Sequence, residues 1–501
     1  MIYNLNLGIG WASSGVEYAQ IYRAKIFRSL KVPAKFIFMD MFPKDNIQHM
    51  TENIGFLDEE VEWLYTFFTD CRISPVTFTL KQLEQTFPTE NFRFSRDGMK
   101  AKYDFPDCDV YHTVYLTDET GNRVHRVEIV ANGKLIRKDY YTYCRIYSEY
   151  YAPLEHKAHL YQRRFYREDG TVCYEEIIDG DRVMYRFPDR ILYSKEELIG
   201  YMISRLKLTK EDVVIIDRSK TIASAVLRLA QPAKVGNVIH AEHFNETMTN
   251  EDTILWNNHY EYPFSQSERI DFFVTATEEQ KKLLAEQMIK YKNRKPKIAA
   301  IPVGSLAELK YPDNGRKPHS LITASRLAAE KHVDWIIDAV IQARAVIGDL
   351  TLDIFGKGAY EEELKKQIAE KNASEYIHLC GQQDLTEVYK NYEAYISGSM
   401  SEGFGLTLME AAGSGLPIIG FDVRYGNQAF IDNEENGYLL KVQTDDGPRE
   451  KTECLCRAIV KLFTEAPLER FHEHAYEKAG QYLTTEVEKK WEKLLQELRE
   501  C

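Results

Sequence analysis

Short apolar runs alternate with helical patterns along the chain from about residue 212 onward. One series contains DVVIIDR at 212–218 and DFFVTA at 271–276, and a second begins near residue 317 and reaches LPIIGFD at 416–422. Strands that alternate with helices form parallel, doubly wound sheets. The sequence therefore predicts an α/β protein with two Rossmann-like domains.

A different pattern interrupts the first of these domains. From about 71 to 192, aromatic and polar residues alternate in runs such as VYHTVYLT and HLYQRRFY, separated by hairpin signals that include Asn132-Gly133 and Asp169-Gly170. We expect an inserted antiparallel β-sheet with Tyr and Arg on one face. The expected parts are an N-terminal Rossmann-like domain (1–70 and 193–310), the inserted extended sheet (71–192), a C-terminal Rossmann-like nucleotide-sugar-binding domain (311–480) and a final helix that packs back across the first domain (481–501).

Charge and cysteine content exclude several classes of function. The 501 residues carry a formal net charge of -13, which argues against nucleic acid as a partner because phosphate backbones need a positive surface. The 8 cysteines are scattered without a CxxC pair, as expected for reduced thiols in the cytosol, and imply no zinc site. With neither a secretory leader pattern nor an apolar run of about 18 residues, the chain is expected to be cytoplasmic.

The strongest motif is SEGFGLTLMEA, which follows the strand-like run AYISGS and opens a helix. Its two carboxylates, Glu402 and Glu410, are spaced to reach opposite ends of a polyhydroxylated ligand. The backbone N–H groups of Gly403, Phe404 and Gly405 lie where a helix N-terminus binds a sugar or phosphate. The structural alternative is a capped helix with a solvated Glu at each end.

A second motif follows the strand SLITA. Arg326 and Lys331 are 5 residues apart, and a guanidinium with an ammonium suits a diphosphate whose charge grows as a sugar departs. Two solvated surface cations are the alternative. Because Arg326 and Lys331 follow a strand in the same way as Glu402, the binding interpretation is favoured.

Two weaker motifs lie in the first domain. In the glycine-rich turn from Gly8 to Glu17, the N–H groups of Gly15, Val16, Glu17 and Tyr18 begin a helix and suit phosphate or sugar, although the turn lacks the complete pattern of a nicotinamide site. His240 ends an apolar strand, where it can bind a sugar hydroxyl.

The residues around His240 leave two roles open. Its neighbours Glu242 and His243 are candidates either to orient it or to meet the acceptor. The spacing is not HExxH, so zinc hydrolysis is disfavoured. Asp107-Cys108-Asp109 matches a metal-binding DxD pattern, but its place in the inserted sheet predicts a surface loop. No metal is expected.

Together these motifs resemble the retaining GT-B glycosyltransferases, the large family that includes sucrose and glycogen synthases. The resemblance implies that Glu402 binds the donor sugar and Glu410 the ribose, while Arg326 and Lys331 bind the diphosphate. It also implies that His240 contacts the sugar and Gly15 and its neighbours the phosphate. Gln382 and Gln383, in CGQQDL after a strand, would face the base.

A closer resemblance spans the whole chain and rests on NLNLGIGWASSGVEYAQ, VIHAEHFNETMTNEDTILWNNHY and the Tyr-rich insertion. The chain is similar to the catalytic (GtfA) subunits of the accessory-secretion (accessory Sec) glycosyltransferase pair. This implies transfer of N-acetylglucosamine from UDP-GlcNAc to Ser or Thr of serine-rich-repeat adhesins before export. It implies no metal, a homologous non-catalytic partner, GtfB, and at most peripheral association with the inner face of the membrane.

Three alternatives remain at this stage. UDP-glucose fits the same motifs, because the sequence does not show which residues contact the substituent at carbon 2 of the sugar. A non-catalytic acceptor-binding subunit shares the fold, although the presence of Arg326, Lys331, Glu402 and Glu410 disfavours it. A transferase acting on lipids or small glycans would need a basic or amphipathic membrane face, which the acidic chain does not show.

Overall fold

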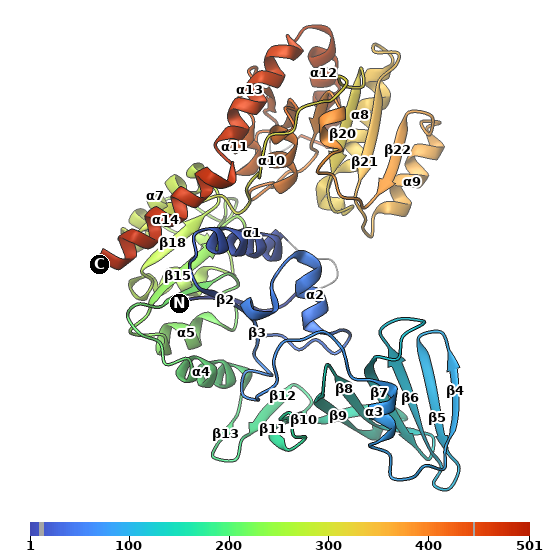
Figure 1. The fold of residues 1–501 in the computed structure, drawn as a ribbon. Helices are drawn as coiled ribbons and strands as arrows, with labels where there is room; N and C mark the ends of the chain where they lie inside the picture. The colour runs from blue at the N-terminus through green and yellow to red at the C-terminus, as the bar shows by residue number, and fades with distance from the viewer. Residues whose placement is uncertain (10–14, 444–445, 501) are drawn as a thin grey trace. The chain divides into compact units, whose positions relative to one another are not determined.

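The computed structural model describes residues 1–9, 15–443 and 446–500 (Figure 1). The chain divides into two compact units. The first unit comprises Met1–Ala24 and Lys31–Asn237, and the second comprises Lys25–Leu30 and Val238–Cys501. Each unit is built around parallel strands, and the first also carries a large antiparallel sheet.

The parallel strands of the first unit lie in the order β15-β14-β1-β2-β3. All four residues of β14, VVII, are buried, as expected for a strand covered on both faces. The sheet order changes direction between β1 and β14, so the loops after these two strands meet at a topological switch point. The strands are β1 (Ile2–Asn6), β2 (Ala34–Phe38), β3 (Val61–Trp63), β14 (Val213–Ile216) and β15 (Lys234–Ile239); the helices are α1 (Gly15–Ser29), α2 (Ile47–Ile54), η1 (Asp58–Glu60), α4 (Lys195–Arg205) and α5 (Ala223–Leu229).

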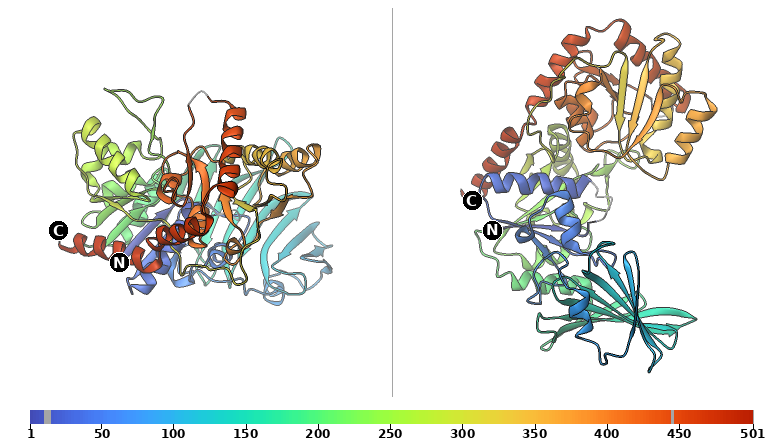
Figure 2. Two further views of the ribbon diagram at one scale, coloured as in Figure 1. Left: turned by 90° about the horizontal axis from the view of Figure 1, so that it is seen from above. Right: turned by 45° about the vertical axis from the view of Figure 1, so that its right-hand side comes forward.

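The antiparallel insertion is a sheet of 10 strands in consecutive order from β4 to β13. Its strands are strongly twisted (Figure 2). This meander confirms the antiparallel sheet expected from the hairpin signals. The elements are α3 (Leu80–Glu84), β4 (Arg93–Asp97), β5 (Lys100–Phe105), β6 (Val110–Leu116), β7 (Val124–Ala131), β8 (Lys134–Tyr141), β9 (Arg145–Leu154), β10 (Lys157–Tyr166), β11 (Val172–Asp179), β12 (Arg182–Arg186) and β13 (Ile191–Leu192).

Aromatic rings fasten this insertion to the parallel strands of the same unit. Phe165 stacks on Tyr174 across β10 and β11, with ring centroids 4.5 Å apart. Tyr65, just after β3, stacks on Phe165 at 5.5 Å, and Trp63 packs against Tyr147 at 6.0 Å. Burial of large aromatic rings is a major source of stability, so this contact holds the inserted sheet firmly in place.

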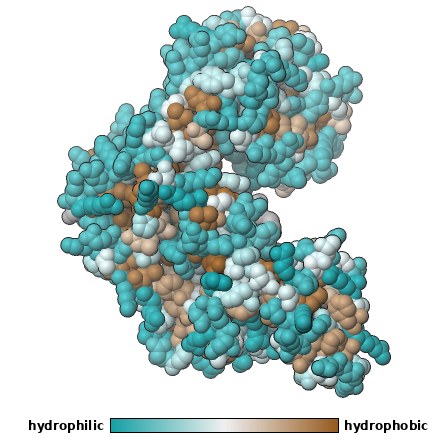
Figure 3. Space-filling view, viewed as in Figure 1, coloured by the Kyte–Doolittle hydropathy of each residue, from teal (hydrophilic) through white to brown (hydrophobic). Residues whose placement is uncertain are grey.

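Tyrosines and cations pair across the surface of the insertion. The guanidinium of Arg126 lies 4.1 Å from the ring centre of Tyr115, its neighbour across β6 and β7, and Arg164 lies 4.9 Å from that of Tyr150. The expected sharing of one face by Tyr and Arg is confirmed at these pairs. Apolar side chains are visible among polar ones on this part of the surface (Figure 3).

The second unit contains a sheet of 6 parallel strands in the order β22-β21-β20-β23-β24-β25. Numbered along the chain, this is the 3-2-1-4-5-6 order of a doubly wound Rossmann sheet. The elements are β20 (Ser320–Ala324), η3 (Ala329–Lys331), α8 (Val333–Arg344), β21 (Thr351–Phe355), α9 (Glu361–Glu370), β22 (Ile377–Gly381), η4 (Tyr389–Asn391), β23 (Ala394–Ile396), α10 (Leu406–Gly413), β24 (Ile418–Phe421), α11 (Gly426–Phe430), β25 (Gly437–Leu440) and α12 (Pro448–Thr464).

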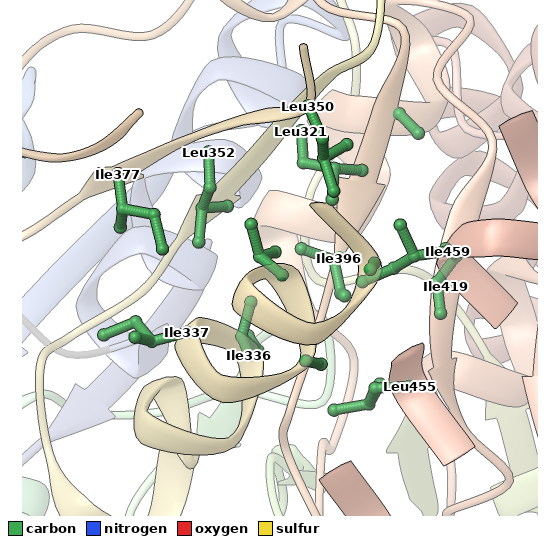
Figure 4. Packing of buried hydrophobic residues seen from close by; sticks show 14 of the residues in the cluster. Leu321, Ile336, Ile337, Leu350, Leu352, Ile377, Ile396, Ile419, Leu455 and Ile459 are labelled. Atoms are coloured by element: carbon green, nitrogen blue, oxygen red, sulfur yellow. The ribbon is translucent and has the colours of Figure 1, made fainter. Parts of the chain in front are cut away.

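The core of this sheet lies against α8 and α12. Ile336 and Ile337 of α8 are fully buried among aliphatic side chains of the strands, with Leu455 and Ile459 of α12 beside them (Figure 4). Close packing of this kind fixes the strand ends, and with them the loops that carry the motif residues.

The remaining elements of the second unit precede and follow this sheet. Within this unit, which includes residues 25–30 at the end of α1, Trp491 of α14 packs edge to face on Phe27, with ring centroids 5.3 Å apart. No helix among the described residues is long and apolar enough to cross a membrane. The elements are β16 (Phe244–Asn245), β17 (Leu255–Trp256), α6 (Glu261–Ser265), η2 (Ser267–Arg269), β18 (Phe272–Thr275), α7 (Glu278–Lys292), β19 (Ile298–Ala300), α13 (Leu468–Gly480) and α14 (Thr484–Glu500).

Candidate active site

An ion pair joins two loops at the switch point of the six-stranded sheet. The order of this sheet reverses between β20 and β23, and ligands of such folds bind at the carboxyl ends of the strands where this reversal occurs. Lys331 follows β20 and Glu402 follows β23, and Lys331 Nζ lies 2.6 Å from Glu402 Oε2. Both side chains are only about one-fifth exposed, at 21% and 23%. A cation and a carboxylate from the two motifs thus meet at the place where a ligand is expected.

The backbone of Glu402 is fixed by hydrogen bonds to the segment before α11. Tyr425 N and Gly426 N donate to Glu402 O at 2.7 and 2.8 Å, and Glu402 N donates to Arg424 O at 3.2 Å. Glu410 lies further along the chain, in α10. The loop between Glu402 and this helix needs a glycine at 405, because this residue has a φ of 84° and directly precedes the helix.

His240 lies beside this glycine-rich turn. A Cβ atom on Gly403 would lie 2.7 Å from the carbonyl oxygen of His240, so only glycine permits this approach. The hydroxyl of Tyr260 accepts hydrogen bonds from His240 N and Ala241 N, both at 3.0 Å. The structure therefore places the backbone of His240 beside the turn that carries Glu402.

Glu410 is half-buried on α10. Burial raises the pKa of its carboxyl to about 7, an effect opposed by the hydroxyl of Tyr389, which donates to Glu410 Oε2 at 3.3 Å. The carboxyl is consequently partly protonated at neutral pH, and a ligand that donates hydrogen bonds would favour its ionised form.

Arg326 has a different partner. It is 71% exposed and donates from Nη2 to Glu330 Oε1 at 2.7 Å, four residues along the chain. An exposed pair of this kind contributes little to folding, so the guanidinium is available to exchange its carboxylate partner for a phosphate.

Gln382 and Gln383 follow β22, at the same end of the six-stranded sheet as the Lys331 and Glu402 loops. Both side chains are exposed, and Gln383 Nε2 donates to Cys380 O at 2.7 Å. Contact of Gln382 and Gln383 with a nucleotide base stays a prediction of the resemblance.

The glycine-rich turn of the first unit is described only in part. Residues 10–14 lie outside the described residues, whereas Gly15, Val16, Glu17 and Tyr18 form the first turn of α1. The Glu17 side chain is buried and accepts from Asn6 Nδ2 at 3.1 Å and from Arg218 at 3.2 Å. It therefore links the end of β1 and the first turn of α1 to the loop after β14, while Gly15 and Tyr18 are exposed.

The neighbours of His240 have structural partners. His243 is fully buried, and its Nε2 lies 2.7 Å from Gln287 Oε1 on α7. Glu242 lies 3.6 Å from Arg424, whose guanidinium also pairs with Glu246. Burial of His243 favours the orienting role over contact with an acceptor.

Sequence reasoning missed two residues of the site. Tyr389 contacts Glu410, and Tyr425 is hydrogen-bonded to Glu402 through its backbone. Both tyrosines are buried, and the spacing of charged residues gives no signal for them.

The expected surface position of the DxD pattern is confirmed, because Asp107, Cys108 and Asp109 are exposed between β5 and β6. Among the described residues, no group of three or more His, Cys, Asp or Glu side chains is placed to hold a metal ion.

Comparisons with known proteins give the family. Two family models match, the GtfA extended beta-sheet domain over residues 93–189 and glycosyl transferases group 1 over 310–452. The chain is 52% identical over 500 residues to the UDP-N-acetylglucosamine–peptide N-acetylglucosaminyltransferase GtfA subunit of Streptococcus gordonii, covering 100% of this chain and 99% of the relative. The corresponding subunit of Streptococcus agalactiae is 51% identical, with 99% of both chains covered.

Solved structures agree with this assignment. A chain of a crystallised GtfA/B complex superposes with a TM-score of 0.96 at 52% identity over 100% of both chains. The pneumococcal O-GlcNAc transferase GtfA, crystallised with UDP and GlcNAc, gives 0.94 at 47% identity over 99% and 98% of the two chains. The chain thus has the GT-B fold and belongs to the family of UDP-N-acetylglucosamine–peptide N-acetylglucosaminyltransferase GtfA subunits.

Proposed function

We propose that this chain is a retaining protein O-glycosyltransferase that moves N-acetylglucosamine from UDP-GlcNAc to Ser or Thr residues of a polypeptide. The observation that carries the proposal is the Lys331–Glu402 ion pair at the switch point of the six-stranded sheet. The full-length relatives named for this reaction, and one crystallised with UDP and GlcNAc, support the choice of donor.

Each motif residue then has a chemical role. Lys331 and Arg326 bind the diphosphate and neutralise the negative charge that grows on it as the sugar departs. Glu402 and His240 bind the sugar, and Glu410 accepts hydrogen bonds from the ribose hydroxyls. The turn from Gly403 to Gly405 offers backbone N–H groups to the sugar or phosphate. Residues 15–18, at the start of α1, offer further N–H groups to the phosphate. Gln382 and Gln383 contact the base.

The reaction proceeds with retention on one face of the sugar. The bond from the anomeric carbon to the phosphate oxygen breaks, and a bond to the acceptor oxygen forms on the same face. The leaving phosphate oxygen receives the proton of the Ser or Thr hydroxyl. The chain supplies positioning and charge stabilisation, without a carboxylate nucleophile and without a metal cofactor.

The acceptor in this proposal is a serine-rich-repeat adhesin, modified in the cytoplasm before export through the accessory Sec system. A homologous, non-catalytic GtfB subunit helps to hold it, in keeping with the crystallised GtfA/B complex of a relative. The inserted sheet suits this task because all five residues of its edge strand β4 are exposed, and extended peptides bind to such edges. Any membrane association is peripheral, at the inner face.

The test is transfer by the purified chain together with its partner subunit, using a Ser/Thr-rich peptide. UDP-GlcNAc and UDP-glucose are supplied separately, each with and without EDTA. We expect EDTA-resistant transfer from UDP-GlcNAc. Transfer only from UDP-glucose would reassign the donor, and absence of turnover with both donors would indicate a non-catalytic subunit.

A further inference from the structure

We propose that Tyr425 and His243 are positioning residues for the donor sugar, because they join the loop that carries His240 to the turn that carries Glu402. This inference rests on the proposed function, which assigns sugar binding to His240 and Glu402. It concerns two buried side chains that take no direct part in the proposed reaction.

Tyr425 holds Glu402 through the backbone. Its N–H donates to Glu402 O at 2.7 Å, and the two residues form a parallel β-bridge. The next residue, Gly426, gives this segment room: a Cβ there would lie 2.3 Å from Phe404 O and 3.0 Å from Cγ of Glu402. The segment from 424 to 426 is therefore fitted closely around the Glu402 turn.

The side chain of Tyr425 points to a different loop. It is 1% exposed, and its hydroxyl lies 3.1 Å from His243 Nδ1, with the two rings nearly parallel at 6.0 Å. His243 is three residues beyond His240 in the loop after β15. A buried hydrogen bond thus connects the two loops that bear the sugar-binding residues, beside the ion pairs of Arg424 with Glu242 and Glu246.

The protonation of His243 fixes the direction of this hydrogen bond. Burial lowers the pKa of the imidazole to about 4, so the ring is neutral near pH 7. Gln287 Oε1 faces Nε2 at 2.7 Å and can only accept, so Nε2 carries the proton. Nδ1 is consequently the acceptor for the Tyr425 hydroxyl.

Helix α7 anchors the loop on its other side. Gln287 holds His243, and Gln280 Nε2 donates to Ala241 O at 2.9 Å. Gln287 and Gln280 lie on the same long helix, which runs from Glu278 to Lys292. Contacts therefore run from α7 through the 240–243 loop and Tyr425 to Glu402.

The test separates sugar positioning from general stability. Tyr425→Phe keeps the ring and removes only the hydroxyl, and His243→Asn keeps an acceptor near the place of Nδ1, whereas His243→Leu removes it. Tyr476→Phe is the matched control. Tyr476 lies on α13 in the second unit, and its hydroxyl also makes a hydrogen bond, donating to Lys310 O at 2.7 Å.

Binding of UDP and UDP-GlcNAc is measured by calorimetry for every variant, alongside transfer kinetics and the melting temperature. For Tyr425→Phe and His243→Leu we expect UDP affinity to stay within about twofold of wild type. UDP-GlcNAc affinity or kcat/KM should fall about 3- to 10-fold, the range of one lost hydrogen bond. His243→Asn is expected to retain most of the wild-type value, and Tyr476→Phe to change neither ligand's affinity.

Equal losses of UDP and UDP-GlcNAc affinity, or a lower melting temperature with unchanged kinetics, would overturn the inference. Additive effects in the Tyr425→Phe, His243→Leu double variant would overturn it as well, because side chains that act through one bond are not additive. Failure of the proposed function is distinguishable, since the wild-type chain would then not bind or use UDP-GlcNAc at all.

Discussion

Lys331 Nζ lies 2.6 Å from Glu402 Oε2, so the loops after β20 and β23 meet in one ion pair. Replacing Lys331 by Met keeps the length of the side chain and removes the charge. We expect kcat to fall by about 100-fold or more, because one lost electrostatic contact to a departing group costs that much in other enzymes.

The matched control for this substitution is Lys478→Met. Lys478 is similarly enclosed, at 18% exposure, and pairs with Asp432 at 2.9 Å on another part of the second unit. Steady-state transfer kinetics for both variants give the comparison. Similar losses in the two would show that the Lys331 effect is not specific to the site.

Arg326 offers a test with little cost to folding. Its side chain is exposed and pairs with Glu330, which is also exposed, so Arg326→Ala should shift the melting temperature by no more than about 1–2 °C. We expect transfer to be abolished, because the guanidinium binds the diphosphate in the proposed reaction.

The matched control is Arg449→Ala. It removes a comparable pair with Glu453, also four residues apart, and should leave turnover unchanged. Near-normal turnover of Arg326→Ala would remove this residue from the mechanism.

The pKa of Glu410, raised by burial to about 7, predicts a pH-dependent affinity for the donor. The carboxyl must be ionised to accept hydrogen bonds from both ribose hydroxyls, so UDP-GlcNAc affinity should rise as the pH increases through about 7. Glu410→Gln cannot ionise and should bind more weakly at pH 8 with a flatter profile. Calorimetric titration across this range is the measurement, and an unchanged slope in the variant would contradict the assignment.

The raised pKa of Glu410 also makes the stability of the fold depend on pH. The folded state holds the Glu410 proton more tightly than the unfolded chain, so the free energy of unfolding falls as pH rises from the ordinary value of 4.5 to about 7 and stays level above it. Since the side chain is only half-buried, the expected loss is about 1–2 kcal/mol. Urea unfolding of wild type and Glu410→Gln at pH 5 and pH 8 measures the difference.

The aromatic contact between the inserted sheet and the parallel strands predicts a stability effect. Phe165 is fully buried between Tyr65 and Tyr174, so Phe165→Ala should destabilise the first unit by about 3–5 kcal/mol. Phe94→Ala, on the exposed edge strand β4, removes a ring contact with Tyr103 at 4.9 Å and should cost about 1 kcal/mol or less. Urea unfolding followed by circular dichroism distinguishes them, and comparable losses would show that Phe165 does not hold the insertion.

The sequence was sufficient to predict the architecture, because the spacing of apolar residues and the positions of turn residues are local properties of the chain. Buried parallel strands such as VVII at 213–216 and hairpin turns such as Asn132-Gly133 are readable one segment at a time. The expected α/β fold with an antiparallel insertion is confirmed by the parallel sheets, the ten-stranded sheet and the GT-B relatives.

The details of the site depend on distances that no local pattern contains. The sequence groups Arg326 with Lys331, five residues further along, yet Arg326 pairs with Glu330 and Lys331 with Glu402. No charged motif points to Tyr389 or Tyr425, and their contacts with Glu410 and Glu402 follow from the packing of η4 and of the segment before α11. Such pairs appear only once the sheet order places the loops together.

The most direct test of the account is the anomeric configuration of the product, followed by NMR during transfer from UDP-GlcNAc to a Ser/Thr-rich peptide in the presence of EDTA. We predict an α-linked N-acetylglucosamine, the configuration of the donor, formed about 100-fold or more slowly by Lys331→Met than by the wild type. A β-linked product, or transfer that stops with EDTA and returns with a divalent cation, would contradict it.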